Sequence, residues 1–170
     1  MGLAGTAALG LTLPRADRRL IVIVESDGCF ADGLEVATGA TLGRRTLRVV
    51  DYGKIAATFV DMATGTALRA RPRDGVRERA LAYAPQERRR YFGQLLGYQR
   101  MPDHELLVIQ PVRLAAPASD LLGRAGYRTR CAACGEEIIN GREVWREESV
   151  LCRACAGNSY YSERVDHSGL

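Results

Sequence analysis

The chain has 170 residues, of which 46% are hydrophobic and 26% are charged. These proportions are typical of a globular protein and exclude a disordered or fibrous chain, and the length suits one ordinary domain plus a small module. The net charge of +4 is mild, and the uncharged N-terminal stretch is too short to cross a bilayer, so we expect no membrane segment.

The N-terminal third predicts one helix, one strand and a second helix. Small apolar residues at 2–11 read as the tail of a longer helix that ends before Pro14. A continuous run rich in isoleucine and valine follows at Leu20–Val24 and predicts a buried strand. An amphipathic pattern over Cys29–Thr38 predicts a helix, and Gly39 ends it because glycine readily adopts a left-handed cap.

The middle of the chain predicts further strands and two charged helices. We expect strands at 46–52, 55–61, 66–71 and 106–114 and helices at 73–82 and 85–98, with Pro85 at a first helical position. The fold class expected is therefore α+β: a mixed α/β core domain over residues 1–118, followed at 119–170 by a linker and a four-cysteine zinc-finger domain of the treble-clef or zinc-ribbon kind.

Two Cys-x-x-Cys pairs carry the strongest chemical signal, and 17 residues separate them. Their members are Cys131, Cys134, Cys152 and Cys155. Four thiolates on two tight turns form the closed tetrahedral site of a structural zinc ion. Disulfides or a redox pair are the alternatives, but a redox motif needs no second copy at this spacing. We expect zinc to supply folding free energy rather than catalysis, because a closed site has no open position for substrate.

Cys29 is the fifth cysteine, and a count of four plus one favours a reducing, cytoplasmic location. It follows a predicted strand end and opens a predicted helix, where unpaired backbone N–H groups favour a thiolate. It is therefore a candidate nucleophile or metal ligand. The alternative is that it is a small buried apolar residue.

A second candidate cluster is Asp51-Tyr52-Gly53-Lys54, which follows a predicted strand. Lys54 is the only lysine in a chain that otherwise uses arginine, and lysine offers a compact ammonium with a tunable pKa. The acid, the phenol and the amine are candidate catalytic or anion-binding groups. A plain polar turn is the alternative. His104 and His167 are both interpreted as solvated rather than as metal ligands.

Three segments of the chain form a recognisable set: the run from Glu25 to Gly43, the run Asp51-Tyr52-Gly53-Lys54 continued to Phe59, and the C-terminal cysteine pairs. Together they resemble the FmdE family, which is named for a component of formylmethanofuran dehydrogenase. The resemblance implies an α+β core with a treble-clef zinc finger and a homodimer. It also implies a metal or small-ligand site near Cys29, and an association with the subunits of molybdenum or tungsten oxidoreductases.

The resemblance leaves out one family feature, a His-Gly-His-x-Cys-Pro-Gly segment that leads into the first helix. The 170 residues start inside what corresponds to that helix. Two hypotheses follow: Met1 is an internal methionine of a longer reading frame, or this member has lost part of the site.

Two functions of different classes follow from the sequence. The first is a zinc-binding accessory or ligand-binding subunit that works beside a molybdenum or tungsten oxidoreductase. The second is a zinc-finger adaptor whose arginines contact nucleic acid or a protein partner. We rank it lower and do not expect a nucleic-acid partner, because five glutamates largely neutralise the arginines of the same module.

Overall fold

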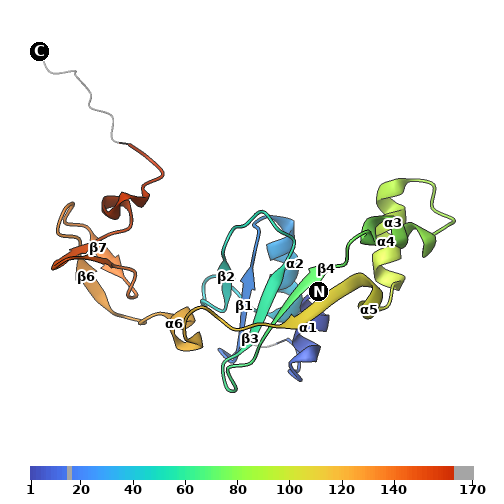
Figure 1. Ribbon diagram of the computed structural model, residues 1–170, viewed down its shortest axis with the longest axis horizontal. Coiled ribbons are helices and arrows are strands. Elements are labelled where there is room, and N and C mark those ends of the chain that lie inside the picture. The colour runs from blue at the N-terminus through green and yellow to red at the C-terminus, as the bar shows by residue number, and fades with distance from the viewer. Residues whose placement is uncertain (15–16, 163–170) are drawn as a thin grey trace, which may run out of the picture. The chain divides into compact units, whose positions relative to one another are not determined.

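The structure is a computed structural model and describes residues 1–14 and 17–162. The chain divides into two compact units, Met1–Ala118 and Ser119–Leu170, which are drawn from blue to orange and from orange to red (Figure 1). Each unit is described below by itself. Within the described residues, no helix combines the length and the apolar character needed to cross a membrane.

The first unit is built on a five-stranded sheet with the order β2-β1-β3-β4-β5. Its strands are β1 (Leu20–Val24), β2 (Leu47–Val49), β3 (Ala57–Asp61), β4 (Ala67–Pro72) and β5 (Leu107–Pro111). Strand β1 runs parallel to β2, and the other neighbours are antiparallel. A mixed α/β core followed by a small cysteine-bearing module confirms the fold class expected from the sequence.

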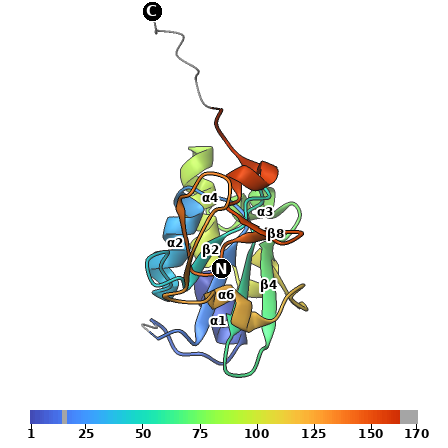
Figure 2. The same ribbon diagram turned by 90° about the vertical axis from the view of Figure 1, so that its left-hand side faces the viewer.

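Two helices, α1 (Gly2–Ala8) and α2 (Cys29–Thr38), cover one face of this sheet (Figures 1 and 2). The small residues of α1 allow it to lie close to the strands. A Cβ atom added at Gly5 would come within 2.4 Å of the Phe59 ring on β3. A larger residue at that position would therefore force the helix away from the sheet.

A helical arm lies between β4 and β5 in the sequence and is seen in green and yellow in Figure 1. It consists of α3 (Val76–Ala82), α4 (Arg90–Arg100) and α5 (Asp103–Leu106). Helices α3 and α4 cross at very short range. A Cβ atom added at Gly97 on α4 would lie only 2.0 Å from the carbonyl oxygen of Ala80 on α3. The arm has its own small core of Val76, Ala80 and Met101.

The second unit contains short elements and buries little apolar surface. They are α6 (Ala118–Leu122), which begins at the boundary, β6 (Arg128–Arg130), β7 (Glu137–Ile139), β8 (Val144–Arg146), β9 (Ser149–Leu151) and the helical turn η1 (Ala154–Asn158). Strand β6 pairs with β7 and β8 pairs with β9. The fully buried apolar residues of the described part of this unit are Cys131 and Ile138. Such a core is too small to hold the unit together by burial alone.

Several expected elements differ from those observed. The strand expected at 46–52 is reduced to β2, because the residues after Val49 turn back to bond to the end of β1. Pro85 lies in the turn between α3 and α4, and the second helix begins only at Arg90. Strands β6 and β7 and helix α6 were not anticipated from the sequence. His167 lies outside the described residues.

Asp61 makes a bidentate ion pair with Arg19, in which Nε and Nη2 donate to the two carboxylate oxygens at 2.9 Å. The backbone N–H of Ala63 also donates to Asp61. The side chain of Asp61 is only 3% exposed. These donors, led by the Arg19 guanidinium, lower the pKa of Asp61 from 3.8 to about 2.

We expect Asp61→Asn to lower the free energy of unfolding at pH 7 by about 1–3 kcal/mol, because it removes a charged partner of Arg19. The folded-state pKa of Asp61 is depressed, so its contribution is fully present above the unfolded-state value near 4. The contribution is lost as the pH falls from there toward 2. Urea unfolding of wild type and variant between pH 7 and pH 2 should show that the two stabilities converge.

The matched control for this measurement is Asp74→Asn, since Asp74 is 97% exposed and pairs with Arg71 at the surface. Exposed pairs of this kind contribute little, so this variant should follow the wild type at every pH. Equal pH dependence for Asp61→Asn and wild type would contradict the assignment.

Candidate functional site

The four cysteines of the second unit are held by its two hairpins. Cys131 and Cys134 form a tight turn after β6, and Gly135 follows with φ of 75°, a conformation that glycine adopts without strain. Cys152 follows β9, and Cys155 lies in η1. Two segments that are far apart in the sequence therefore converge on one place.

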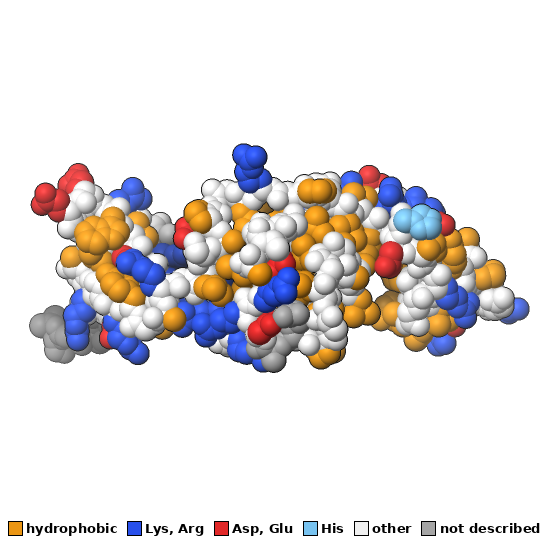
Figure 3. All heavy atoms as spheres, turned by 90° about the horizontal axis from the view of Figure 1, so that it is seen from below, with side chains coloured by type: hydrophobic (Ala, Val, Ile, Leu, Met, Phe, Trp, Pro, Cys, Tyr) orange, Lys and Arg blue, Asp and Glu red, His pale blue; other side chains and the backbone are white. Residues whose placement is uncertain are grey.

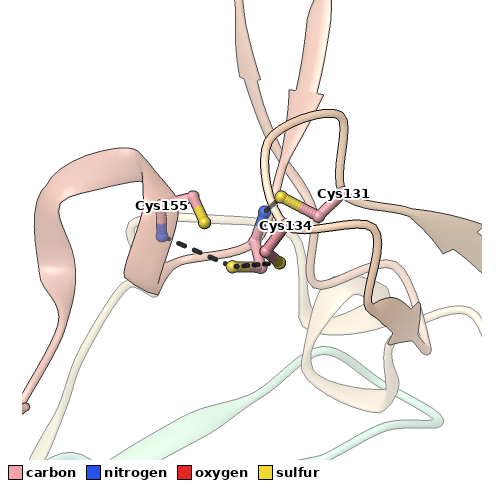
Figure 4. A group of neighbouring side chains, drawn as sticks. Cys131, Cys134 and Cys155 are labelled. Carbon is pink, nitrogen blue, oxygen red and sulfur yellow. Dashed lines mark hydrogen bonds between the residues drawn. The ribbon is translucent and has the colours of Figure 1, made fainter. Parts of the chain in front are cut away.

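The sulfur atoms of Cys131, Cys134, Cys152 and Cys155 all lie within 4.8 Å of one another, and those of Cys134 and Cys152 are 4.0 Å apart. The side chains labelled in Figure 4 turn toward a common centre. Tetrahedral coordination with metal–sulfur bonds of about 2.3 Å separates sulfurs by about 3.8 Å, and a disulfide would need about 2.05 Å. The geometry therefore fits four ligands around one metal ion.

Backbone dipoles and crowding act in opposite directions on these thiols. Backbone N–H groups of Cys134 and Cys152 lower the pKa of Cys131 to about 6, which favours its thiolate. The neighbouring sulfur groups, Cys152 first, raise the pKa of Cys155 to about 12. Four thiolates at this spacing repel one another, so full deprotonation requires a cation between them.

Cys29 begins α2 and is exposed. It lines a groove of about 320 Å³ between α1 and α2, together with apolar residues that include Leu3, Phe30 and Leu34. The structure thus places the thiol on an accessible surface and not in the core. In the described part of the chain, the four C-terminal cysteines are the only group of three or more metal-ligating side chains, and none forms around Cys29.

The loop that carries Asp51, Tyr52 and Lys54 is attached to the end of β1. The backbone N–H groups of Tyr52 and Lys54 both donate to the carbonyl oxygen of Glu25, which lies four residues before Cys29. Asp51 accepts a hydrogen bond from the N–H of Gly53 at 2.8 Å and so shapes the turn. Tyr52 is 64% exposed, and the Lys54 ammonium lies 5.8 Å from its ring centre.

An ion pair between Glu25 and Arg69 supports this loop and was not anticipated from the sequence. Both guanidinium donors, Nε and Nη2, lie 2.6 Å from the carboxylate oxygens. The Arg69 guanidinium lowers the pKa of Glu25, and Lys54 contributes in the same direction from a greater distance. The only sequence signal was a single arginine between Leu68 and Ala70 in a predicted strand.

A larger cavity of about 570 Å³ lies between the sheet and the base of the helical arm. Ile55, next to Lys54, lines it from the sheet side, and Arg73, Arg77 and Tyr98 line it from the arm side. A volume of this size suits a small organic ligand. No pattern in the sequence indicated this cavity, because its walls come from segments that are far apart along the chain.

The fold and the cysteine centre define an α/β domain joined to a metal-binding module. Residues 1–108 match the family described as FmdE, Molybdenum formylmethanofuran dehydrogenase operon, and this match covers most of the first unit. The chain therefore belongs to the FmdE family. The family predicted from the sequence is confirmed.

Two relatives support this conclusion. The crystal structure of a tungsten formylmethanofuran dehydrogenase FmdE-like protein from Syntrophus aciditrophicus is 25% identical with a TM-score of 0.51, over 89% of this chain and 78% of that one. A probable S-adenosyl-L-methionine-binding protein from Archaeoglobus fulgidus is 29% identical over 84% of this chain. This chain spans 42% of the length of that archaeal relative.

We expect the purified chain to hold one metal ion, to lose it in Cys152→Ser and to keep it in Cys29→Ser, measured by elemental analysis. Trp145 on β8 is the only tryptophan, so its fluorescence reports on the second unit. A strong chelator should shift Trp145 emission and leave the helical and strand signal of the first unit largely intact, because the metal supplies the folding free energy of the small unit. Metal retained in Cys152→Ser, or lost in Cys29→Ser, would contradict the assignment.

Proposed function

We propose that the protein is a zinc-binding accessory or ligand-binding subunit, linked to molybdenum or tungsten formylmethanofuran dehydrogenase or to formate-type oxidoreductase chemistry. It acts as a cytoplasmic homodimer. The observation that supports a zinc ion is the cluster of four cysteine sulfurs, which all lie within 4.8 Å of one another. A site made only of thiolates favours zinc over magnesium, calcium or manganese, which prefer oxygen ligands.

The accessory role is supported by the family match and by the name of the Syntrophus relative. The zinc site has all four positions filled by cysteine, so its role in this proposal is structural. Ligand binding then belongs to the first unit, around the end of β1. There Cys29 offers an accessible thiol, and Asp51, Tyr52 and Lys54 form an exposed loop beside the cavity that Ile55 lines.

The adaptor alternative is supported less well by the second unit. Arg128 is paired with Glu137, and Arg124 is paired with Glu143 and stacks on the Tyr127 ring. Arginines already engaged by carboxylates are poor partners for phosphate, because the pairs must first be broken.

The accessory role predicts a direct complex with oxidoreductase subunits. We expect the zinc-loaded chain, mixed at micromolar concentration with purified molybdenum or tungsten formylmethanofuran dehydrogenase, to sediment with it. A sample treated with chelator is the control for a role of the second unit. Independent sedimentation of the two proteins would overturn the accessory role and leave the zinc assignment standing.

A second candidate concerns the ligand. The name of the archaeal relative points to S-adenosyl-L-methionine, a molecule that carries an ammonium, a carboxylate and a sulfonium. The lining of the cavity at the base of the arm includes groups of both signs, Arg73 and Arg77 with Asp74 and Glu78, and apolar residues such as Leu107. Such a mixed lining suits a zwitterion with an aromatic base.

We expect S-adenosyl-L-methionine to bind the chain in titration calorimetry and Arg77→Ala to weaken this binding by about tenfold or more, because the variant removes one of the two arginines that line the cavity. Arg113→Ala is the matched control, since Arg113 lies beside a different groove at the end of β5. No heat of binding with the wild type would exclude this ligand, and equal loss in both variants would place it outside the cavity.

A further inference from the structure

Helix α4 carries its large apolar side chains on the outside of the arm. Its buried residues are Gly93 and Gly97, whereas Tyr91 is 70% exposed and Phe92 and Leu95 are exposed as well. Hydrophobic side chains appear in orange over the arm at the right-hand end of Figure 3. A helix in a small protein normally does the opposite and turns its large apolar residues inward.

The packing of the arm explains this inversion. The crossing of α3 and α4 leaves no room for a side chain at Gly97, where a Cβ atom would lie 2.0 Å from the oxygen of Ala80. At Gly93 an added Cβ would lie 3.1 Å from Leu81. The arm therefore cannot bury Tyr91, Phe92 or Leu95 within itself. These side chains can be removed from water only if another surface contacts the outer face of α4.

The arm is also strongly basic. Residues 76–100 contain six arginines and two glutamates. Among the described residues no carboxylate pairs with the Arg88 guanidinium, and the pair of Arg90 with Glu78 joins two exposed side chains. Arg89 lies 4.2 Å from the Phe92 ring centre. The outer face of α4, with the arginines that precede it, thus combines aromatic groups with excess positive charge, and its partner should be apolar and acidic.

The same unit presents such a surface on its two other helices. Helix α1 has no charged residue, and α2 with its preceding turn carries Asp27, Asp32 and Glu35 but no lysine or arginine. Between the helices lies the apolar groove lined by Cys29, and Val36 on α2 is 84% exposed. Asp27 and Asp32, on either side of Cys29 in the sequence, thus give the α1–α2 face negative charge beside an apolar groove, which complements the outer face of α4. Glu35 lies on the opposite side of α2 from the groove.

We propose that the outer face of α4 of one copy docks on the α1–α2 face of a second copy and covers Cys29. This inference rests on the homodimer proposed above and adds the two surfaces that form it. Under two-fold symmetry the contact occurs twice, so each copy both gives and receives an arm. An anionic membrane would attract the arm but would leave the acidic α1–α2 face unused, whereas a second copy uses both.

The docking places the arm of one copy at the thiol of the other. Tyr91 and Phe92 then form a wall of the groove that holds Cys29, and the groove becomes a closed ligand pocket only in the dimer. Aromatic and arginine side chains are the residues that contribute most to interfaces of this kind.

The first test is a charge exchange followed by sedimentation equilibrium of the zinc-loaded chain. We expect Arg88→Glu and Asp32→Arg each to raise the dimer dissociation constant by about tenfold or more, because each places like charges across the contact. The double variant, Arg88→Glu with Asp32→Arg, restores opposite charges and should regain most of the affinity. Arg113→Glu makes the same charge change at an exposed residue that lines a different groove, with none of α1, α2 or α4, and should dimerise like the wild type.

The second test uses the thiol. Alkylation of Cys29 by a bulky maleimide should be slow in the dimer and should accelerate several-fold on dilution and in Tyr91→Ala. Cys29→Ser provides the background from the four metal-bound cysteines. This readout separates covering of Cys29 from a general loss of stability, because a folded monomer reacts faster while its circular dichroism is unchanged.

The outcomes distinguish the proposed homodimer from the proposed docking of α4 on the α1–α2 face. A chain that remains monomeric at all concentrations overturns both the homodimer and the docking. A dimer whose affinity is unchanged by both charge substitutions, or whose Cys29 is alkylated as fast as in the monomer, overturns the docking alone. Binding of the arm to anionic phospholipid vesicles by a chain that stays monomeric also overturns it.

Discussion

The burial of strand β1 is the constraint on which the first unit depends. Leu20, Val22 and Val24 lie against α1 and α2, while β2 and β3 occupy both edges of the strand. Hydrogen-bonded pairing on both sides fixes its register, with Val22 opposite Leu47 on β2 and opposite Phe59 on β3. The end of β1 is therefore a fixed point. From it, Gly28 leads into the helix of Cys29, and the carbonyl oxygen of Glu25 holds the loop of Lys54.

The two units owe their stability to different physical causes. The first unit buries a continuous apolar layer that includes Phe59, Leu34 and Leu47, so the hydrophobic effect is its main source of stability. The second unit buries only Cys131 and Ile138 among its described apolar residues, and its four sulfurs are placed to hold a metal ion, whose binding would supply the missing folding free energy. A sheet held together by apolar burial and a module with four converging sulfurs thus coexist in one chain.

Local patterns in the sequence predicted the elements whose residues decide their own structure. The apolar run of β1, the helix from Cys29 to its left-handed Gly39 and the spacing of the cysteine pairs are of this kind. Contacts between residues far apart in the sequence determined the features that these patterns did not predict. Strand β2 is short because its continuation bonds to Glu25, and α4 begins at Arg90 because the segment before it forms the turn from α3. The cavity at the base of the arm and the partner of Arg69 join residues that no local pattern connects.

The contact between Gly97 and the carbonyl oxygen of Ala80 has a consequence for how this chain can change during evolution. The atom that blocks a side chain at position 97 belongs to the backbone, so no substitution at position 80 can make room for it. A clash between two side chains is often relieved by a second mutation, but this one has no such compensation. Position 97 is thus fixed as glycine for as long as the two helices cross at their present distance, and a lineage that abandons it must rebuild the whole arm.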